Sequence, residues 1–460
     1  MSRFFSEIRA LMKLALPVAL AQLALVGMTA TDVLIAGNAS TVDLAGMNLG
    51  ANTWNMIIMF FMGIGFATQP LVAKRFGAKD RPGVKHQLHQ SIWMCLGLGV
   101  IATVMVWFAA WLLLLLEFQQ EMLSIAYQYL LTISLCAIPM VLIPAVRGTL
   151  EGLSLPRPVF WINFAAFLAN IPLDYILVNG LYGFPKLGGV GCAWATVVLI
   201  WTMVLLNFLV LRSHKHIRQL KLLDGFQKPN GQSIRATLKL GFPIGVSIVI
   251  ELSMFCGAGI MIATFGPIQA SAHSVAITIA SMSFMLYMGL AQGVTIRASQ
   301  LLGGQLPVAA WYTVKSGTAF NVMVSILICV CFLIFNERLV HLFSNDPDVI
   351  ALAIVLVYFG VAFQIADSLQ VAVIGALRAY HDTSSPPRYQ FFAFWVVGLP
   401  MGVGLAFYGW WPGLEGAKGF WMGMVSSLFL VGVLLLKRLF TMVGDLSDEH
   451  LNPSKLRADR

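Results

Sequence analysis

The chain has 460 residues, of which 58% are hydrophobic and only 11% are charged, and its mean hydropathy is +0.82. Soluble domains carry roughly 25% charged residues, so this composition excludes a soluble globular protein and predicts a polytopic membrane protein without a sizeable soluble domain. The net charge is +9, but the basic residues lie in short loops between apolar runs. That pattern indicates membrane topology rather than nucleic-acid binding.

The apolar runs predict twelve transmembrane helices, if each span needs about 20 apolar residues. They cover approximately residues 14–36, 50–73, 90–116, 124–146, 159–178, 188–211, 240–263, 273–299, 314–335, 349–374, 389–409 and 416–436. The basic clusters, among them Arg147 with Arg157 and residues 212–221, all fall on one side of this topology. Because basic loops favour the cytoplasmic side, both termini of this multi-pass membrane protein are predicted to be cytoplasmic.

The two halves of the chain repeat each other. The segment KLALPVALAQL, which begins at Lys13, is answered by KLGFPIGVSIV from Lys239, about 226 residues later. Six spans in each half would make the halves parallel repeats, related by an axis along the membrane normal. The predicted domains are an N-terminal six-helix lobe at 1–211, a cytoplasmic linker at 212–236, a C-terminal six-helix lobe at 237–440 and a cytoplasmic tail at 441–460.

Four acidic residues lie well inside predicted spans, namely Asp32, Asp174, Glu251 and Asp367. No lysine or arginine is expected to sit deep enough to neutralise them permanently. Carboxylates at such a depth are costly and usually functional, because each must bind a proton or a metal cation. These are the coupling ions of secondary transport, so all four residues are candidate ion-binding groups.

In the first half, Asn170 and Asp174 are four residues apart and would share one face of a helix. Pro172 between them removes a backbone donor and frees a carbonyl. With Asp32 they form an oxygen-rich cluster suited to a shared proton or to Na⁺, and the hydroxyl of Thr196 is a further candidate ligand. The alternative is structural: the polar groups would only satisfy the broken backbone, and Thr196 would bond its own preceding turn.

In the second half, Ser247 and Glu251 share a face at a spacing of four residues. Gln364, Asp367 and Gln370 form a polar stripe that must face protein or water rather than lipid. Together they predict a second cation-coupling site, in which Ser247, Gln364 and Gln370 support the two carboxylates. The alternative is a polar seam that holds helices together.

Other chemistries find no support in the sequence. The six cysteines lack the spacing of metal sites or disulfide frameworks, no nucleotide-binding motif is present, and no catalytic arrangement can be argued. We therefore expect a protein that is not an enzyme and has no cofactor besides H⁺ or Na⁺ as coupling ion.

Taken together, several motifs resemble the multidrug and toxic compound extrusion (MATE) family, close to its NorM-like bacterial branch, over nearly the whole chain. The motifs are Leu16-Pro17, Asp32 to Gly37, Gly148 to Gly152 with Pro156 and Pro158, Asn170 to Tyr175, Gly188 to Cys192, Gly241-Phe242-Pro243 with Glu251, and Asp367 with Gln370 and Gly375 to Arg378.

The resemblance implies an all-α membrane protein with two six-helix lobes in a V shape. It implies that Asp32, Asn170 and Asp174 match the acidic cluster of the first lobe, and that Glu251 and Asp367 match the second-lobe pair ascribed to sodium coupling. Two positions depart from the family pattern. Phe363 replaces an aromatic hydroxyl four residues before Asp367, and position 174 is a carboxylate where some members carry an amide, which ranks the first-lobe site ahead.

The predicted function is secondary antiport, in which cationic or amphipathic drugs leave the cell in exchange for H⁺ or Na⁺. Proline is a common cause of helix kinks, so Pro17 is a candidate hinge that couples ion binding at Asp32 to the drug cleft. The expected partners are small-molecule drugs, cationic dyes and the lipid bilayer, with no nucleic acid, and the chain is expected to act as a monomer. The alternatives are a flippase for lipid-linked saccharides and an integral-membrane enzyme.

Overall fold

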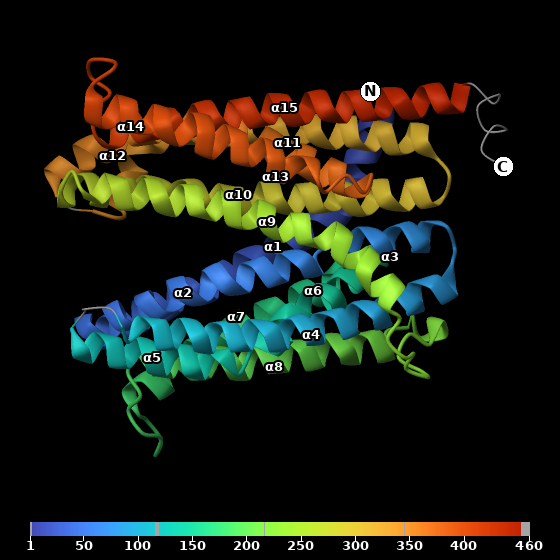
Figure 1. Cartoon of the computed structure of the whole chain (residues 1–460), viewed down its shortest axis with the longest axis horizontal. Coiled ribbons are helices and arrows are strands. Elements are labelled where there is room, and N and C mark those ends of the chain that lie inside the picture. The colour runs from blue at the N-terminus through green and yellow to red at the C-terminus, as the bar shows by residue number, and fades with distance from the viewer. Residues whose placement is uncertain (1, 116–118, 216, 345, 452–460) are drawn as a thin grey trace. The chain divides into compact units, whose positions relative to one another are not determined.

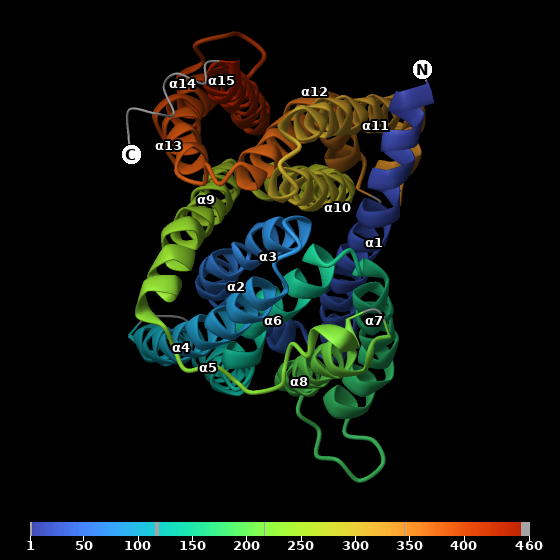
Figure 2. The ribbon, with the colours of Figure 1, turned by 90° about the vertical axis from the view of Figure 1, so that its right-hand side faces the viewer.

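The secondary structure is helical throughout the computed structural model, which describes residues 2–115, 119–215, 217–344 and 346–451. No strand occurs within these ranges. Figure 1 shows the helices along the chain, and Figure 2 shows them after a quarter turn. The predicted all-α fold class is confirmed. The last nine residues of the predicted tail, 452–460, lie outside the described residues.

Within the described residues, eleven helices are long and apolar enough to cross a membrane, and a bent pair of helices raises the number to twelve. The pair is α5 (Gln120–Ser134) with α6 (Ala137–Gly152), which meet at 45°. The break falls at Leu135 and Cys136, just before Pro139, and a proline at this place suits the first turn of a new helix. The predicted number of spans agrees with this count.

The chain forms two compact units, each built from more than one segment. The first, here called the N-unit, comprises Leu16–Val249 and Ser299–Gln305; the second, the C-unit, comprises the described residues of Met1–Ala15, Ile250–Ala298 and Leu306–Arg460. The chain passes between the units four times: inside α1 (Ser2–Ala39), α9 (Gly231–Ala263) and α10 (Pro267–Gly303), and between Gln305 and Leu306.

The other helices belong to a single unit. The N-unit holds α2 (Thr41–Gly65), α3 (Thr68–Gly77), α4 (Arg81–Leu113), α5, α6, α7 (Pro156–Asn179), α8 (Gly189–Ser213) and the short 3₁₀ turn η1 (Arg218–Leu220). The C-unit holds α11 (Pro307–His341), α12 (Pro347–Ala379), α13 (Ser385–Phe391), the π-helical turn η2 (Phe392–Gly398), α14 (Leu399–Tyr408) and α15 (Ala417–Leu451). In the N-unit α7 packs along α8, and in the C-unit α12 packs along both α11 and α15.

Local sequence signals set several helix ends. Asp80 accepts a hydrogen bond from the backbone N–H of Gly83 over 2.9 Å, and Pro82 occupies the first turn, so α4 begins there. Asp346 and Pro347 start α12 in the same way. Gly180 ends α7 with a φ of +71°, a backbone conformation that residues with a side chain rarely adopt. Gly180 thus fixes the end of α7, the helix that carries Asn170 and Asp174.

The predicted place of Arg147 in a cytoplasmic loop is wrong. Arg147 lies inside α6 and is only 7% exposed, and its Nε donates a hydrogen bond to Glu151 Oε1 over 2.6 Å. A buried charge needs a partner, and the glutamate four residues later provides one on the same helical face. Position along the sequence could not distinguish this pair from a charged loop, because Glu151 and Arg157 lie close by in the same segment.

The linker between the two repeats contacts the start of α4. His89 is fully buried, and its two ring nitrogens lie 2.6 Å from the carbonyl oxygen of Leu222 and 3.2 Å from the backbone nitrogen of Gln227. Trp93 donates its indole N–H to the carbonyl of Gln227, and Phe226 lies against the rings of both His89 and Trp93. The linker is therefore held by side chains of α4.

Candidate functional site

The first candidate site lies in the N-unit, where α1 meets α7. Asn170 Nδ2 donates a hydrogen bond to Asp32 Oδ1 over 3.0 Å, and the carboxyl group of Asp174 lies within hydrogen-bonding reach of that of Asp32. Asn170 and Asp174 are fully buried, whereas Asp32 is half-buried. The structure therefore brings together the three residues that the sequence had proposed as one cluster.

Asp174 has an unusual environment for a carboxyl group. Both of its oxygens are buried, and neither makes a hydrogen bond of acceptable geometry with a donor among the described residues. Its polar neighbours are Asn170 and the carboxyl group of Asp32. Two carboxyl groups can share a hydrogen bond only if one of them carries a proton. The two carboxyl groups are therefore neighbours at a place where Asp174 has no donor among the described residues.

Three further residues surround this pair, and sequence reasoning missed all of them. Thr31 Oγ1 donates to Asn170 Oδ1 over 2.5 Å, Cys192 Sγ lies 3.7 Å from the backbone oxygen of Asp32, and the buried Tyr129 is an electrostatic neighbour of Asp32. Thr31 could have been noticed because it directly precedes Asp32. Cys192 and Tyr129 carry no such signal, since they lie on α8 and α5, and only the packing of these helices brings them to the site.

Thr196 is the one proposed member that the structure does not connect to the cluster. It is half-buried on α8, and no hydrogen bond joins it to Asp32, Asn170 or Asp174 within the described residues. The structure thus places it in the same unit, with no hydrogen bond to the carboxyl pair among the described residues.

The second candidate site lies in the C-unit around Glu251 of α9. Its two carboxyl oxygens accept hydrogen bonds from Gln370 Nε2 over 3.1 Å and from Gln390 Nε2 over 3.4 Å. Gln370 comes from α12 and Gln390 from α13, and both are fully buried. Gln370 was among the predicted supporting residues, whereas Gln390 was not, because nothing in its own segment marks it.

Asp367 lies on α12, is 2% exposed, and interacts electrostatically with Glu251. Gln364 is one turn earlier on the same helix and donates to the carbonyl oxygen of Ala280 over 3.3 Å. The side-chain oxygens of Gln364 and Gln370 are buried and have no donor within the described part of the chain. These unused oxygens are the kind of ligand that a hard cation prefers.

Ser247 and Arg378 are the two remaining residues that bear on this second site. Ser247 is buried on α9 one turn before Glu251, as its spacing predicted. The sequence predicts no lysine or arginine deep enough to neutralise the carboxylates permanently, and the structure adds that Arg378, in the last turn of α12, attracts Glu251 electrostatically. The sequence places Arg378 after the span, but a long side chain reaches back along a helix toward its preceding turn.

Pro17 lies half-buried inside α1, which continues through it as a helix. Proline has no backbone N–H and cannot donate the helical hydrogen bond to the fourth residue before it. The boundary between the C-unit and the N-unit falls between Ala15 and Leu16, immediately before this proline.

The sites contain no preformed cluster of strong metal ligands. Within the described residues, no group of three or more His, Cys, Asp or Glu side chains is placed to hold a metal ion. The first site offers two carboxyl groups and an amide, and the second offers two carboxyl groups with amide side chains. Such sets can exchange a proton or a weakly held monovalent cation, but they would not retain a transition metal.

Comparisons with known proteins agree on one family. The sequence profile of the MatE family matches residues 17–176 and 243–403, and the second match begins 226 positions after the first. This offset equals that of the internal repeat. The chain is 32% identical over 439 residues to the multidrug resistance protein NorM of Aliivibrio fischeri, covering 95% of each chain. It is 30% identical over 453 residues to the protein of the same name in Vibrio cholerae, covering 98% of this chain and 99% of the other.

Solved structures give the same answer for the fold. A crystal structure described as MATE in the bent conformation superimposes with a TM-score of 0.86 at 17% identity, covering 97% of both chains. An outward-facing multidrug resistance MATE family transporter superimposes with a TM-score of 0.85 at 18% identity, covering 95% of this chain and 96% of the other. At these identities the likeness concerns the fold alone.

Proposed function

This chain belongs to the MatE family of multidrug and toxic compound extrusion transporters, and we propose that it is a secondary antiporter that exports cationic and amphipathic drugs in exchange for H⁺ or Na⁺. The proposal is supported by the names of the relatives to which this chain is similar, which are multidrug resistance proteins NorM. It places the protein in the bacterial inner membrane with both termini in the cytoplasm, acting as a monomer.

The observation that carries this proposal is the carboxyl pair of Asp32 and Asp174. The two groups lie within reach of each other, and Asp174 has no donor of its own among the described residues. Charge at this depth is costly unless it is neutralised. The pair is therefore most stable with one ion bound, and it loses that stability when the ion leaves.

Antiport results if binding of the ion and binding of the drug exclude each other in one protein molecule. In the proposed cycle, an external H⁺ or Na⁺ binds Asp32 and Asp174 and the drug leaves outward. The ion is then released on the cytoplasmic side, where its concentration is lower, and the protein can bind a new drug. Asn170 stabilises the ionised form of Asp32 by donating its amide N–H to the carboxylate.

Glu251 and Asp367 form the second proposed ion site. Glu251 already accepts two hydrogen bonds from amide side chains and is attracted electrostatically by Arg378. Its negative charge is therefore partly compensated. The unused side-chain oxygens of Gln364 and Gln370 favour a cation as the ligand of this site. We rank it behind the first site because the carboxyl pair there is the less compensated of the two.

The test is efflux of a cationic dye, ethidium, from proteoliposomes that contain the purified protein. A pH gradient and a Na⁺ gradient are imposed separately. The wild type is expected to move dye under at least one gradient, and Asp32→Asn is expected to abolish transport under both while it still folds. Glu121→Gln is the matched control, because Glu121 is an exposed carboxylate in the first turn of α5. Transport by Asp32→Asn at the wild-type rate, or none by the wild type, would refute the proposal.

A further inference from the structure

The hydroxyl group of Thr31 has a choice of hydrogen-bond acceptors. It lies 2.5 Å from Asn170 Oδ1, 2.8 Å from the carbonyl oxygen of Met28 and 3.0 Å from that of Gly27. A hydroxyl carries one proton, so it can donate fully to only one of the three. A threonine that served only its own helix would need Met28 or Gly27 alone. The contact with Asn170, on another helix, is the shortest of the three.

The two distances around the amide of Asn170 indicate which way it faces. O–H···O bonds span about 2.5–3.0 Å and N–H···O bonds about 2.7–3.2 Å. The 2.5 Å contact with Thr31 therefore fits an amide oxygen and is too short for an amide nitrogen. The 3.0 Å contact with Asp32 fits an amide N–H donating to the carboxyl group.

This orientation has a consequence for the ion that the cluster can take. With its oxygen held by Thr31, Asn170 presents N–H groups to the carboxyl pair. An N–H group stabilises a carboxylate but repels a metal cation, whereas Na⁺ is bound by oxygen ligands. A proton needs no further ligand, because Asp32 and Asp174 can share it in one hydrogen bond.

We propose that Thr31 is a specificity-determining positioning residue, which holds the Asn170 amide with its N–H toward Asp32 and thereby makes the first site accept H⁺ in preference to Na⁺. The inference rests on the proposed ion-coupled transport. The polar or titratable groups that face the site from neighbouring helices are Tyr129 on α5 and Cys192 on α8, and the variants of Thr31 leave both side chains unchanged in sequence.

The decisive variants are Thr31→Val and Thr31→Ser. Valine keeps the shape of threonine but lacks the hydroxyl, so the amide of Asn170 can turn and offer its oxygen to the cation. Serine keeps the donor. The matched control is Thr53→Val on α2, because among the described residues the hydroxyl of Thr53 donates to the carbonyl oxygen of Leu49 in its own helix, over 2.9 Å, and to no other helix.

Ethidium efflux from proteoliposomes is measured under a pH gradient alone and under a Na⁺ gradient alone. Loss of one hydrogen bond at the site should lower H⁺-driven efflux by Thr31→Val about tenfold, and Na⁺-driven efflux should appear. Thr31→Ser and Thr53→Val should keep the wild-type ratio of the two rates. An unchanged ratio in Thr31→Val, or the same change in Thr31→Ser, would overturn the inference. Wild-type protein that responds to neither gradient would instead refute the proposed function.

A second measurement needs no transport. Ligands that bind the folded state raise its thermal midpoint, so detergent-solubilised protein is heated with NaCl or with choline chloride at the same ionic strength. Na⁺ should stabilise Thr31→Val more than the wild type and Thr53→Val. Equal stabilisation of all three would contradict the inference, even if Thr31→Val transports poorly.

Discussion

Arg147 and Glu151 form a buried ion pair one helical turn apart in α6, with 2.6 Å between Nε and Oε1. The pair extends to two other helices of the N-unit. Gln69 on α3 donates to Glu151 Oε2 over 2.5 Å, and Arg147 Nη1 donates to Gln22 Oε1 on α1 over 3.2 Å. All four side chains are at most 8% exposed. The network therefore connects α1 to α3 and α6 at a point five residues after Pro17.

Glu151→Gln is predicted to destabilise the protein strongly. The change leaves the buried guanidinium of Arg147 without a counter-charge, which typically costs about 3–5 kcal/mol. Thermal unfolding in detergent should show this loss. The double variant Glu151→Gln with Arg147→Gln should be less unstable than the sum of the single changes, because no buried charge remains. The exposed Arg157→Gln is the control, and a Glu151→Gln midpoint equal to that of this control would contradict the prediction.

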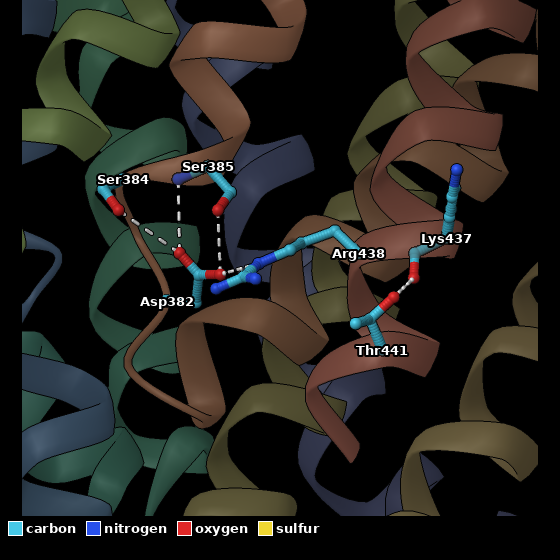
Figure 3. A network of polar contacts seen from close by, with 6 residues as sticks. All are labelled: Asp382, Ser384, Ser385, Lys437, Arg438 and Thr441. Carbon is cyan, nitrogen blue, oxygen red and sulfur yellow. Dashed lines mark hydrogen bonds and ion pairs between the residues drawn. The ribbon is translucent and has the colours of Figure 1, made fainter. Parts of the chain in front are cut away.

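The α12–α13 connection is predicted to lose stability in acid. Asp382 accepts hydrogen bonds from Arg438 Nε over 2.7 Å and from the backbone N–H and hydroxyl of Ser385 (Figure 3). Burial raises the pKa of Asp382, but the bonds from Arg438 and Ser385 outweigh burial, and the net pKa is lowered. A carboxylate with a lowered pKa stabilises the fold above its unfolded pKa of about 3.9 and loses that contribution as the pH falls through its folded pKa.

Asp382→Ala should therefore lower the thermal midpoint at neutral pH, since each lost hydrogen bond to Ser385 or Arg438 contributes about 1 kcal/mol. The difference from the wild type should begin to shrink as the pH falls below about 3.9, and it should disappear only below the lowered pKa of folded Asp382, where the wild-type carboxyl group is itself protonated. The comparison is made in detergent across a pH series. A difference that stayed constant down to the most acidic sample would show that the charge of Asp382 does not contribute.

Pro17→Ala is predicted to slow transport without loss of folding. Alanine restores the missing backbone donor of α1 and is the better helix former, so the helix should become stiffer next to the boundary between the units. The repeat provides the control: Pro243 is the counterpart of Pro17, but the counterpart of Asp32 is Ala258. Dye efflux should therefore fall more in Pro17→Ala than in Pro243→Ala. Transport by Pro17→Ala at the wild-type rate would exclude the hinge.

His89→Ala is predicted to release the linker from α4. The histidine ring contacts the backbone at both Leu222 and Gln227, and alanine leaves both backbone groups without these partners. Limited trypsin digestion should then cut faster at Lys221 and Lys228. His86→Ala should have the smaller effect, because within the described part of the chain the ring of His86 hydrogen-bonds to the side chains of Gln227 and Ser233 and not to the backbone. Equal digestion rates for wild type and His89→Ala would disprove this role of the ring.

Much of the fold could be read from the sequence, because a bilayer imposes strong local rules. A helix is the simplest way to satisfy every backbone group within one segment in lipid, so apolar length alone predicted the spans, and caps such as Asp80 and Asp346 set their starts. Glycine contacts were less predictable. A Cβ on Gly77 would lie 1.9 Å from the carbonyl oxygen of Gln300, more than two hundred residues away.

In the candidate sites, too, some features follow from the local sequence and others depend on tertiary contacts. Asn170 and Asp174 share a helical face because four residues make about one turn, and their depth marked them and Asp32 as candidates. By itself the sequence predicted four carboxyl groups inside the spans, but it left the buried Glu151 of α6 outside them. Only the tertiary structure decided which side chains surround each one. Asp174 lies near Asp32, and Glu251 accepts hydrogen bonds from Gln370 and Gln390 and is attracted by Arg378. Glu151 lies in one network with Arg147, Gln69 and Gln22. The physical reason is that insertion into a bilayer depends on the properties of one segment, whereas side-chain partners depend on which helices pack together.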